Sequence, residues 1–257
     1  MTWDPKIYLA FGGARTRAAA ELLGRIDSET PCAVADLGCG PGNSTELLAA
    51  RWPQAAIDGI DSSPAMLREA SKTAVRARWI EADVGRWTPG TLYDVIYANA
   101  TLHWVPDHVA LLPRLLSNLA PGGILAFQVP RNFREPSHAI MQTLAADPRW
   151  SARLEGVGDW WNVLEPEQYY AILEPHCTSI DIWETRYLQC LEGDDAVYRW
   201  VQGTGLRPYA DALDGADRED FLREYRSRVA DAYPCRASGV TLFPFQRLFC
   251  VAKKTKA

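Results

Sequence analysis

The sequence lacks any apolar run that approaches the ~18 residues needed to cross a membrane. Its first residues, Met1–Lys6, include no apolar export region. These two absences predict a cytoplasmic protein without a membrane partner.

The cysteines and histidines also lack the spacing of a metal site. The six cysteines are scattered along the chain, and His103 and His108 lie five positions apart rather than four, with no supporting pattern of carboxylates. Without an export signal, the cysteines are expected to remain thiols. The sequence therefore predicts neither a metal ion nor a disulfide framework. The cysteines are Cys32, Cys39, Cys177, Cys190, Cys235 and Cys250.

An excess of positive charge is absent as well. The formal net charge is −5, which argues against a surface that grips nucleic acid. A chain of 257 residues with 47% hydrophobic content can form one good core and still carry an insertion. We therefore predict a single domain over residues 1–257, and the oligomeric state stays open.

What the sequence does contain is a glycine-rich turn between an apolar strand and a helix, over residues 34–44. Glycine allows the backbone to approach a ligand closely, and the following helix offers unpaired N–H groups. A pyrophosphate site would need a third glycine where Asn43 stands, and Asp36 would repel that group. A carboxylate suits an ammonium or a hydroxyl, which favours S-adenosylmethionine over a dinucleotide. The glycines are Gly38, Gly40 and Gly42.

This turn resembles the first motif of the class I S-adenosylmethionine-dependent methyltransferases, an acidic residue followed by G-x-G-x-G. A second apolar segment ends in Asp61, about 20 residues after the glycines, which is the spacing of a ribose-binding carboxylate. A third segment, residues 79–84, ends with Asp83 and Val84. The resemblance implies that Asp83 binds the adenine amine and that Val84 packs on the adenine ring.

Each of these acids has a purely structural alternative, because an aspartate after a strand often caps the next turn or helix. Asp61, followed by Ser62-Ser63-Pro64, fits that role well. In a parallel sheet, however, successive strand ends lie along the edge where ligands bind. Three acids at three such ends favour a ligand site. Asp94 begins its strand instead, so we predict a structural role for it.

Short apolar runs alternate with helical stretches through the first half of the chain, which predicts a parallel sheet with right-handed crossovers. Together with the resemblance, this gives an α/β fold with a doubly wound, seven-stranded, mostly parallel sheet of the Rossmann-like methyltransferase type. Residues 130–161 are expected to be irregular. Residues 188–241 are predicted to form a helical cap insertion before the last strand, and such a long insertion favours a functional lid.

Over nearly its whole length, the chain further resembles members of the family that methylate a carboxylate of a small polycarboxylic acid. This closer resemblance implies a monomethyl ester as product. No catalytic residue is expected, because a carboxylate is already ionised at neutral pH. Arg207 lies in a Gly-Leu-Arg-Pro turn within an aromatic insertion, and its planar guanidinium suits a carboxylate. Arg131 departs from the family pattern and is left out of the site.

The remaining residues of the candidate site follow from the resemblance. For substrate binding, Arg15 and Arg17 would assist Arg207, and the pocket would be walled by Tyr8, Phe11 and Trp104. For cofactor binding, the resemblance implies Asp36, Gly38, Gly40, Asn43, Asp61, Ser62, Met66, Asp83, Val84 and Asn99.

Four other functional classes can be compared with the motifs of this sequence. A methyltransferase acting on nucleic-acid or protein amines would carry an Asn/Asp-Pro-Pro-aromatic motif, where this chain has Asn99-Ala100-Thr101-Leu102. An NAD-dependent oxidoreductase is disfavoured by Asp36 and Asn43. Another small-molecule O- or C-methyltransferase, of the kind found in ubiquinone biosynthesis, shares the whole first half of the chain. A non-catalytic binding protein on the same scaffold is also compatible with these residues.

Overall fold

The computed structural model describes residues 12–158 and 162–256, with side chains from residue 16 onward. The chain divides into two compact units. Unit 1 contains residues 1–130, 162–185 and 248–257, and unit 2 contains residues 131–161 and 186–247. Each unit has its own core.

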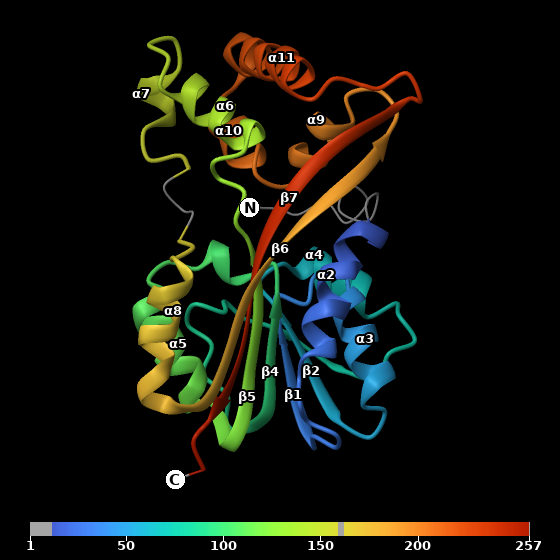
Figure 1. Ribbon diagram of the computed structural model, residues 1–257, viewed down its shortest axis with the longest axis vertical. Helices are drawn as coiled ribbons and strands as arrows, with labels where there is room; N and C mark the ends of the chain where they lie inside the picture. Colours follow the sequence, from blue (N-terminus) through green and yellow to red (C-terminus); the bar gives the residue numbers. More distant parts are fainter. Residues whose placement is uncertain (1–11, 159–161, 257) are drawn as a thin grey trace. The chain divides into compact units, whose positions relative to one another are not determined.

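A seven-stranded sheet forms the framework, with strand order β3-β2-β1-β4-β5-β7-β6. The ladders that join β1 to β2, β1 to β4, β2 to β3 and β4 to β5 are all parallel. Figure 1 shows β2, β1, β4 and β5 side by side in unit 1. The predicted doubly wound, mostly parallel sheet is confirmed. The strands are β1 (Ala33–Leu37), β2 (Ala56–Asp61), β3 (Arg78–Glu81), β4 (Tyr93–Asn99), β5 (Leu119–Pro130), β6 (Cys177–Glu192) and β7 (Val240–Lys254).

Helices cover both faces of this sheet in unit 1. In Figure 1, α5 and α8 lie on one side of the strands, and α2 and α3 lie on the other. The Tyr97 hydroxyl on β4 donates to the Ala19 carbonyl at 2.8 Å, which ties α2 to the sheet. The helices are α2 (Gly12–Gly24), α3 (Asn43–Arg51), α4 (Pro64–Ala70), α5 (His108–Ser117) and α8 (Pro166–Leu173), with short 3₁₀ turns η1 (Leu102–Trp104) and η2 (Glu174–His176).

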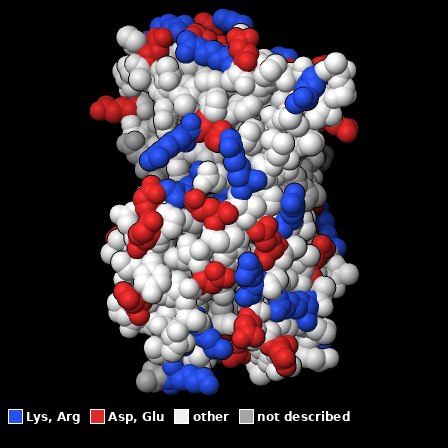
Figure 2. Space-filling view, viewed as in Figure 1, with Lys and Arg blue, Asp and Glu red and all other residues white. Residues whose placement is uncertain are grey.

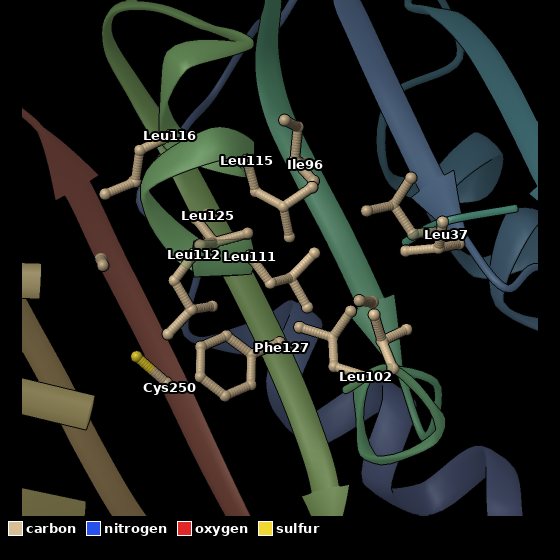
Figure 3. Close-up of a cluster of buried hydrophobic side chains, with 14 of the residues drawn as sticks. Leu37, Ile96, Leu102, Leu111, Leu112, Leu115, Leu116, Leu125, Phe127 and Cys250 are labelled. Atoms are coloured by element: carbon tan, nitrogen blue, oxygen red, sulfur yellow. The ribbon is translucent and has the colours of Figure 1, made fainter. Parts of the chain in front are cut away.

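The core of unit 1 lies between α5 and the central strands. Four leucines of α5 share one face of the helix, and all four are buried. In Figure 3 they lie over β4 and β5, next to Leu125 and Phe127. Burial of each side chain contributes about 1.5–3 kcal/mol relative to exposure. This packing fixes β4 and β5, and hence the strand ends that carry the candidate site. The leucines are Leu111, Leu112, Leu115 and Leu116.

Asp94 joins the beginnings of two neighbouring strands. Its Oδ2 accepts hydrogen bonds from the backbone N–H groups of Cys32 and Ala33, at 2.7 and 3.0 Å. These bonds anchor the start of β1 to the start of β4. The predicted structural role of Asp94 is confirmed.

Unit 2 is helical around the outer parts of β6 and β7. Its buried aromatic side chains include Trp150 and Tyr209, which contact Phe221 edge-on and face-to-face respectively. The expectation that residues 130–161 are irregular is wrong, because Pro136 starts a helix whose buried face includes Met141 and Leu144. The helices are α6 (Pro136–Ala145), α7 (Ser151–Leu154), α9 (Ala196–Gln202), α10 (Arg207–Ala212) and α11 (Gly215–Ala232).

The predicted insertion 188–241 contains α9, α10 and α11. Unit 2 is larger than this insertion, because it also includes α6 and α7, residues 186–187 of β6 and residues 242–247 of β7. The role of these helices as a cap stays a prediction.

Among the described residues, no helix is long and apolar enough to cross a membrane. On the face in view of Figure 2, acidic and basic side chains are interspersed. The expectation that nucleic acid is not a partner stays a prediction.

Candidate active site

The glycine turn between β1 and α3 is bent tightly against its neighbours. Gly38, Gly40 and Gly42 have φ values of +67°, +55° and +97°, a region that L side chains rarely adopt. The N–H of Gly38 donates to the Ile60 carbonyl at 2.7 Å. A Cβ on Gly38 would lie 2.1 Å from Thr101 Oγ1. The turn is therefore held between the ends of β2 and β4 and requires glycine at residue 38.

Asp61, at the end of β2, connects this turn to α4. Its Oδ2 accepts the Gly40 N–H at 2.9 Å, and its Oδ1 accepts the Ser63 N–H at 2.8 Å. Burial raises the pKa of this carboxyl, and the backbone N–H bonds oppose that rise. The structural alternative for Asp61 is thus realised, but each oxygen still has acceptor capacity for a ligand hydroxyl.

Asp36 lies beneath the turn and is fully buried. Its Oδ2 accepts two hydroxyl hydrogen bonds, from Ser44 and Thr45, each at 2.7 Å. Its Oδ1 is buried without a hydrogen-bond partner in the described part of the chain. Burial raises the pKa of Asp36 to about 6, although both hydroxyls lower it. Ser44 and Thr45 are not among the predicted site residues; their position in the first turn of the helix after the glycine turn was the available signal.

The parallel ladders place the strand ends along one edge. Asp36 is paired with Gly59 of β2, and Asp61 with Glu81 of β3. Asp83 follows β3, is exposed, and accepts the Gly85 N–H at 2.8 Å. The structure therefore brings the three predicted acids to adjacent strand ends.

The other predicted cofactor residues surround the same edge. Val84 is buried in the core of unit 1. Asn43 and Asn99 each have a buried side-chain oxygen without a hydrogen-bond partner in the described ranges. Met66 is buried in α4, and its N–H bonds to Ser63, whereas Ser62 is exposed.

The predicted substrate residues are only partly described. Tyr8, Phe11 and the side chain of Arg15 lie outside the described residues. Arg17 is exposed on α2, and Trp104 is half-buried with its ring centre 4.8 Å from that of His103. Those assignments stay predictions.

Arg207 is the first residue of α10 in unit 2. Its side chain is 18% exposed, and its Nε lies 3.4 Å from Asp211 Oδ2. The backbone at this position is thus helical rather than a free turn. Its role toward a substrate stays a prediction.

The polar groups of the turn favour a cationic ligand rich in hydrogen-bond donors. The unsatisfied atoms of Asp36, Asn43 and Asn99 are all oxygens that can accept. A Cβ built on Gly40 would meet no atom of the described residues within 4 Å, so these residues leave the turn open there. Burial raises the pKa of the Cys39 thiol far above its ordinary value, which favours the neutral thiol over the thiolate. Within the described ranges, no cluster of side chains could hold a metal ion.

Comparison with known proteins agrees with this chemistry. A family model described as "Methyltransferase domain" matches residues 34–123. Trans-aconitate 2-methyltransferase of Azoarcus sp. (strain BH72) is 46% identical over 251 residues, covering 98% of each chain. Trans-aconitate 2-methyltransferase of Streptomyces coelicolor is 50% identical over 264 residues, covering 98% of this chain and 87% of that protein.

Solved structures share the fold at low identity. The YcgJ protein from Bacillus subtilis has a TM-score of 0.61 and 12% identity, with 94% of this chain and 99% of that chain covered. Phosphoethanolamine N-methyltransferase 2 of Haemonchus contortus, solved in complex with S-adenosyl-L-methionine, has a TM-score of 0.56 and 14% identity, with coverage of 93% and 52%.

The sheet order and the acids at its strand ends define a Rossmann-like methyltransferase. The similarity to the two trans-aconitate 2-methyltransferases over nearly the full length then identifies the family within this class. The chain belongs to the trans-aconitate 2-methyltransferase family. The predictions of this family, of a transferase and of S-adenosylmethionine as the cofactor are confirmed.

Asp36 is expected to lower the stability of the ligand-free protein at neutral pH. Its folded-state pKa of about 6 exceeds the ordinary 3.8, so the folded chain keeps a proton that the unfolded chain releases between those values. The free energy of unfolding therefore falls as pH rises through this window. Asp36→Asn is expected to raise it at neutral pH by about 1–3 kcal/mol, measured by urea denaturation.

The matched control for this measurement is Asp181→Asn. Asp181 is exposed and pairs with Arg25 at 3.6 Å, so its change is expected to stay within about 0.5 kcal/mol. If the stability gained by Asp36→Asn over wild type did not grow between about pH 4 and 6, the raised pKa of Asp36 would be contradicted.

Proposed function

We propose that this protein transfers a methyl group from S-adenosylmethionine to a carboxylate of trans-aconitate, giving a monomethyl ester and S-adenosylhomocysteine. The observation that carries the proposal is the 46–50% identity, over nearly the full length, to proteins named trans-aconitate 2-methyltransferase. A cytoplasmic location is part of the same proposal.

The residues at the strand ends suit the methyl donor. Asp36 would face its ammonium group and Asp61 its ribose hydroxyls, while Asp83 and Val84 would bind the adenine. The glycine turn would lie along the amino-acid part of the donor. When bound, the donor supplies an electrophilic methyl group on a cationic sulfur.

The acceptor needs no base, because a carboxylate with an ordinary pKa of about 4 is ionised at neutral pH. The protein must hold the carboxylate oxygen in line with the methyl group and the sulfur, and it must exclude water. Effective-molarity estimates allow such positioning to supply roughly 7–11 kcal/mol of the barrier. The absence of a nucleophile or base among the proposed residues therefore agrees with the reaction.

Arg207 is proposed to hold a carboxylate that does not react. A guanidinium offers two parallel donors to a carboxylate, which fixes orientation as well as binding. Arg15 and Arg17 would assist, and Tyr8, Phe11 and Trp104 would wall the pocket. A substrate with three carboxylates requires such cations, because each charge that leaves water must be paired.

The direct test is incubation with methyl-labelled S-adenosylmethionine and a panel of acids: trans-aconitate, cis-aconitate, citrate, isocitrate and a monocarboxylate. We expect labelled methyl ester from trans-aconitate, with the largest kcat/KM of the panel. The ester is identified by mass spectrometry and by its alkaline hydrolysis. Alkali-stable labelled product from another small molecule would instead support the alternative, a different O- or C-methyltransferase.

Arg207→Ala is expected to raise the KM for trans-aconitate about 10- to 100-fold, because a charged hydrogen-bond pair is lost. The affinity for S-adenosylhomocysteine, measured by isothermal titration, is expected to stay unchanged. The control is Arg228→Ala, which removes another arginine of unit 2 that pairs one helical turn away, with Glu224. A KM that Arg207→Ala leaves at the wild-type value would refute this role.

A further inference from the structure

We propose that Ser44 and Thr45 are positioning residues for the methyl donor: their hydroxyls hold Asp36 by one oxygen and leave the other oxygen for the ammonium group of the donor. This inference rests on the proposed function. It adds two residues, and a pH limit, to the cofactor site.

The hydroxyls of Ser44 and Thr45 form a clamp on one carboxylate oxygen of Asp36, Oδ2. The other oxygen, Oδ1, is left open by the described residues. Both hydroxyls donate to Asp36 Oδ2 at 2.7 Å, while Oδ1 has no hydrogen-bond partner in the described part of the chain. Ser44 is 8% exposed, and Thr45 and Asp36 are fully buried. An unpaired carboxylate oxygen at such depth carries a desolvation cost that a cationic donor would offset.

The clamp depends on the way α3 begins. Gly42, at the N-cap, has φ +97° and provides no side-chain cap, and Ser44 and Thr45 follow it in the first turn of the helix. Their hydroxyls point at the acid of β1. The α3 first turn and the β1 end are thus fixed to each other by two charged hydrogen bonds, each worth more than a neutral one.

The charges that act on Asp36 make the hydroxyls necessary. Among the described groups, Asp61 at the neighbouring strand end repels the ionised form, and the buried thiol of Cys39 is neutral. On the β4 side, the paired residue is Tyr97, whose hydroxyl is donated to Ala19. Ser44 and Thr45 are therefore the groups that favour the carboxylate over the carboxylic acid at this depth.

A pH dependence of cofactor binding follows. Burial raises the pKa of Asp36 and the two hydroxyls lower it. Without them, the carboxyl group would keep its proton at higher pH and would no longer attract an ammonium group. Removal of the hydroxyls should therefore shift the acid limb of the binding profile upward, whereas a purely structural defect would weaken binding equally at every pH.

The test is the dissociation constant of S-adenosylhomocysteine across the range from about pH 5 to 8.5, measured by isothermal titration for wild type, Ser44→Ala, Thr45→Val and the double variant. We expect the acid-limb midpoint to move up by about one pH unit per hydroxyl removed. Near neutral pH, the affinity of the double variant is expected to fall about 10-fold or more, with partial recovery at the alkaline end.

Two further variants separate the loss of the hydroxyl hydrogen bonds to Asp36 from a change in side-chain packing. Thr45→Ser keeps a hydroxyl and is expected to keep the wild-type midpoint. Thr73→Val removes a hydroxyl of unit 1 that donates to the Ala70 carbonyl at 2.7 Å, and it should not move the midpoint either. If the double variant does not fold, the single variants carry the same comparison.

The possible failures are distinguishable. A wild-type protein that does not bind S-adenosylhomocysteine would overturn the proposed function. A wild-type protein that binds it, with midpoints that Ser44→Ala and Thr45→Val leave unchanged, would overturn the clamp alone. A midpoint that moves equally in Thr73→Val would also overturn it.

Discussion

Replacing Gly38 by alanine is expected to abolish cofactor binding and to destabilise unit 1 by about 2–5 kcal/mol. Two effects add at this residue. Its φ of +67° is strained for any L side chain, and the new Cβ would lie 2.1–2.7 Å from three side-chain atoms of Thr101. Thr101 cannot retreat cheaply, because its Oγ1 donates to the Asn99 carbonyl at 3.2 Å. Thermal unfolding and titration with S-adenosylhomocysteine would measure the two losses.

The variant Gly40→Ala separates the effect of backbone strain from the effect of a steric clash with Thr101. Gly40 also has a positive φ, +55°, but a Cβ there would meet no atom within 4 Å in the part of the chain that the structure describes. We expect about 1–2 kcal/mol of destabilisation from the backbone alone. The double variant Gly38→Ala/Thr101→Gly removes the colliding atoms, so it should recover part of the stability lost in Gly38→Ala. If Gly38→Ala and Gly40→Ala destabilised the protein equally, the predicted steric clash between a Cβ at residue 38 and Thr101 would be contradicted.

The glycine turn also shows why so much of unit 1 could be predicted. Each element there follows from a local rule: an apolar strand, a glycine turn and an amphipathic helix such as α5. Parallel strands place their ends on one edge, so Asp36, Asp61 and Asp83 could be grouped before any contact was known. Local periodicity and one topological rule were sufficient.

Contacts between distant residues could not be predicted in the same way. Gly38 and Thr101 lie 63 positions apart in the sequence, and no spacing rule predicts that they approach each other so closely. The hydroxyls of Ser44 and Thr45 have the usual residue types of a helix start, so their bonds to Asp36 were hidden behind an ordinary capping signal. Depth of burial, which raises the pKa of Asp36, is likewise a property of the folded chain.

Unit 2 was predicted less well for a different reason. Its core is built from aromatic side chains of separate segments, such as Trp150 with Phe221 and Trp200 with Phe243. Residues 130–161 gave a weak helical signal because their helices are short, ten residues in α6 and four in α7, and Pro130, Pro136 and Pro148 interrupt the segment. The helices α6 and α7 are stabilised by tertiary packing rather than by propensity.

Asp61→Asn is expected to weaken binding of S-adenosylhomocysteine about 100-fold. Both oxygens of Asp61 accept backbone N–H groups, from Gly40 and Ser63. An amide keeps one acceptor and turns its NH₂ group toward the other N–H, so one buried donor loses its partner and the turn shifts. The charge that would attract the ribose hydroxyls is lost as well. Isothermal titration near neutral pH measures the loss.

The matched control is Asp94→Asn, at the opposite end of the sheet. Asp94 also accepts two backbone N–H groups, but both bond to the same oxygen, Oδ2. An asparagine can keep its amide oxygen in that place, so we expect a stability loss of about 1 kcal/mol and no change in affinity. The two variants remove the same charge from similar backbone environments, one at the candidate site and one far along the strands. If Asp94→Asn weakened binding as much as Asp61→Asn, the effect would come from the stability of the sheet, and Asp61 would have no direct part in holding the donor.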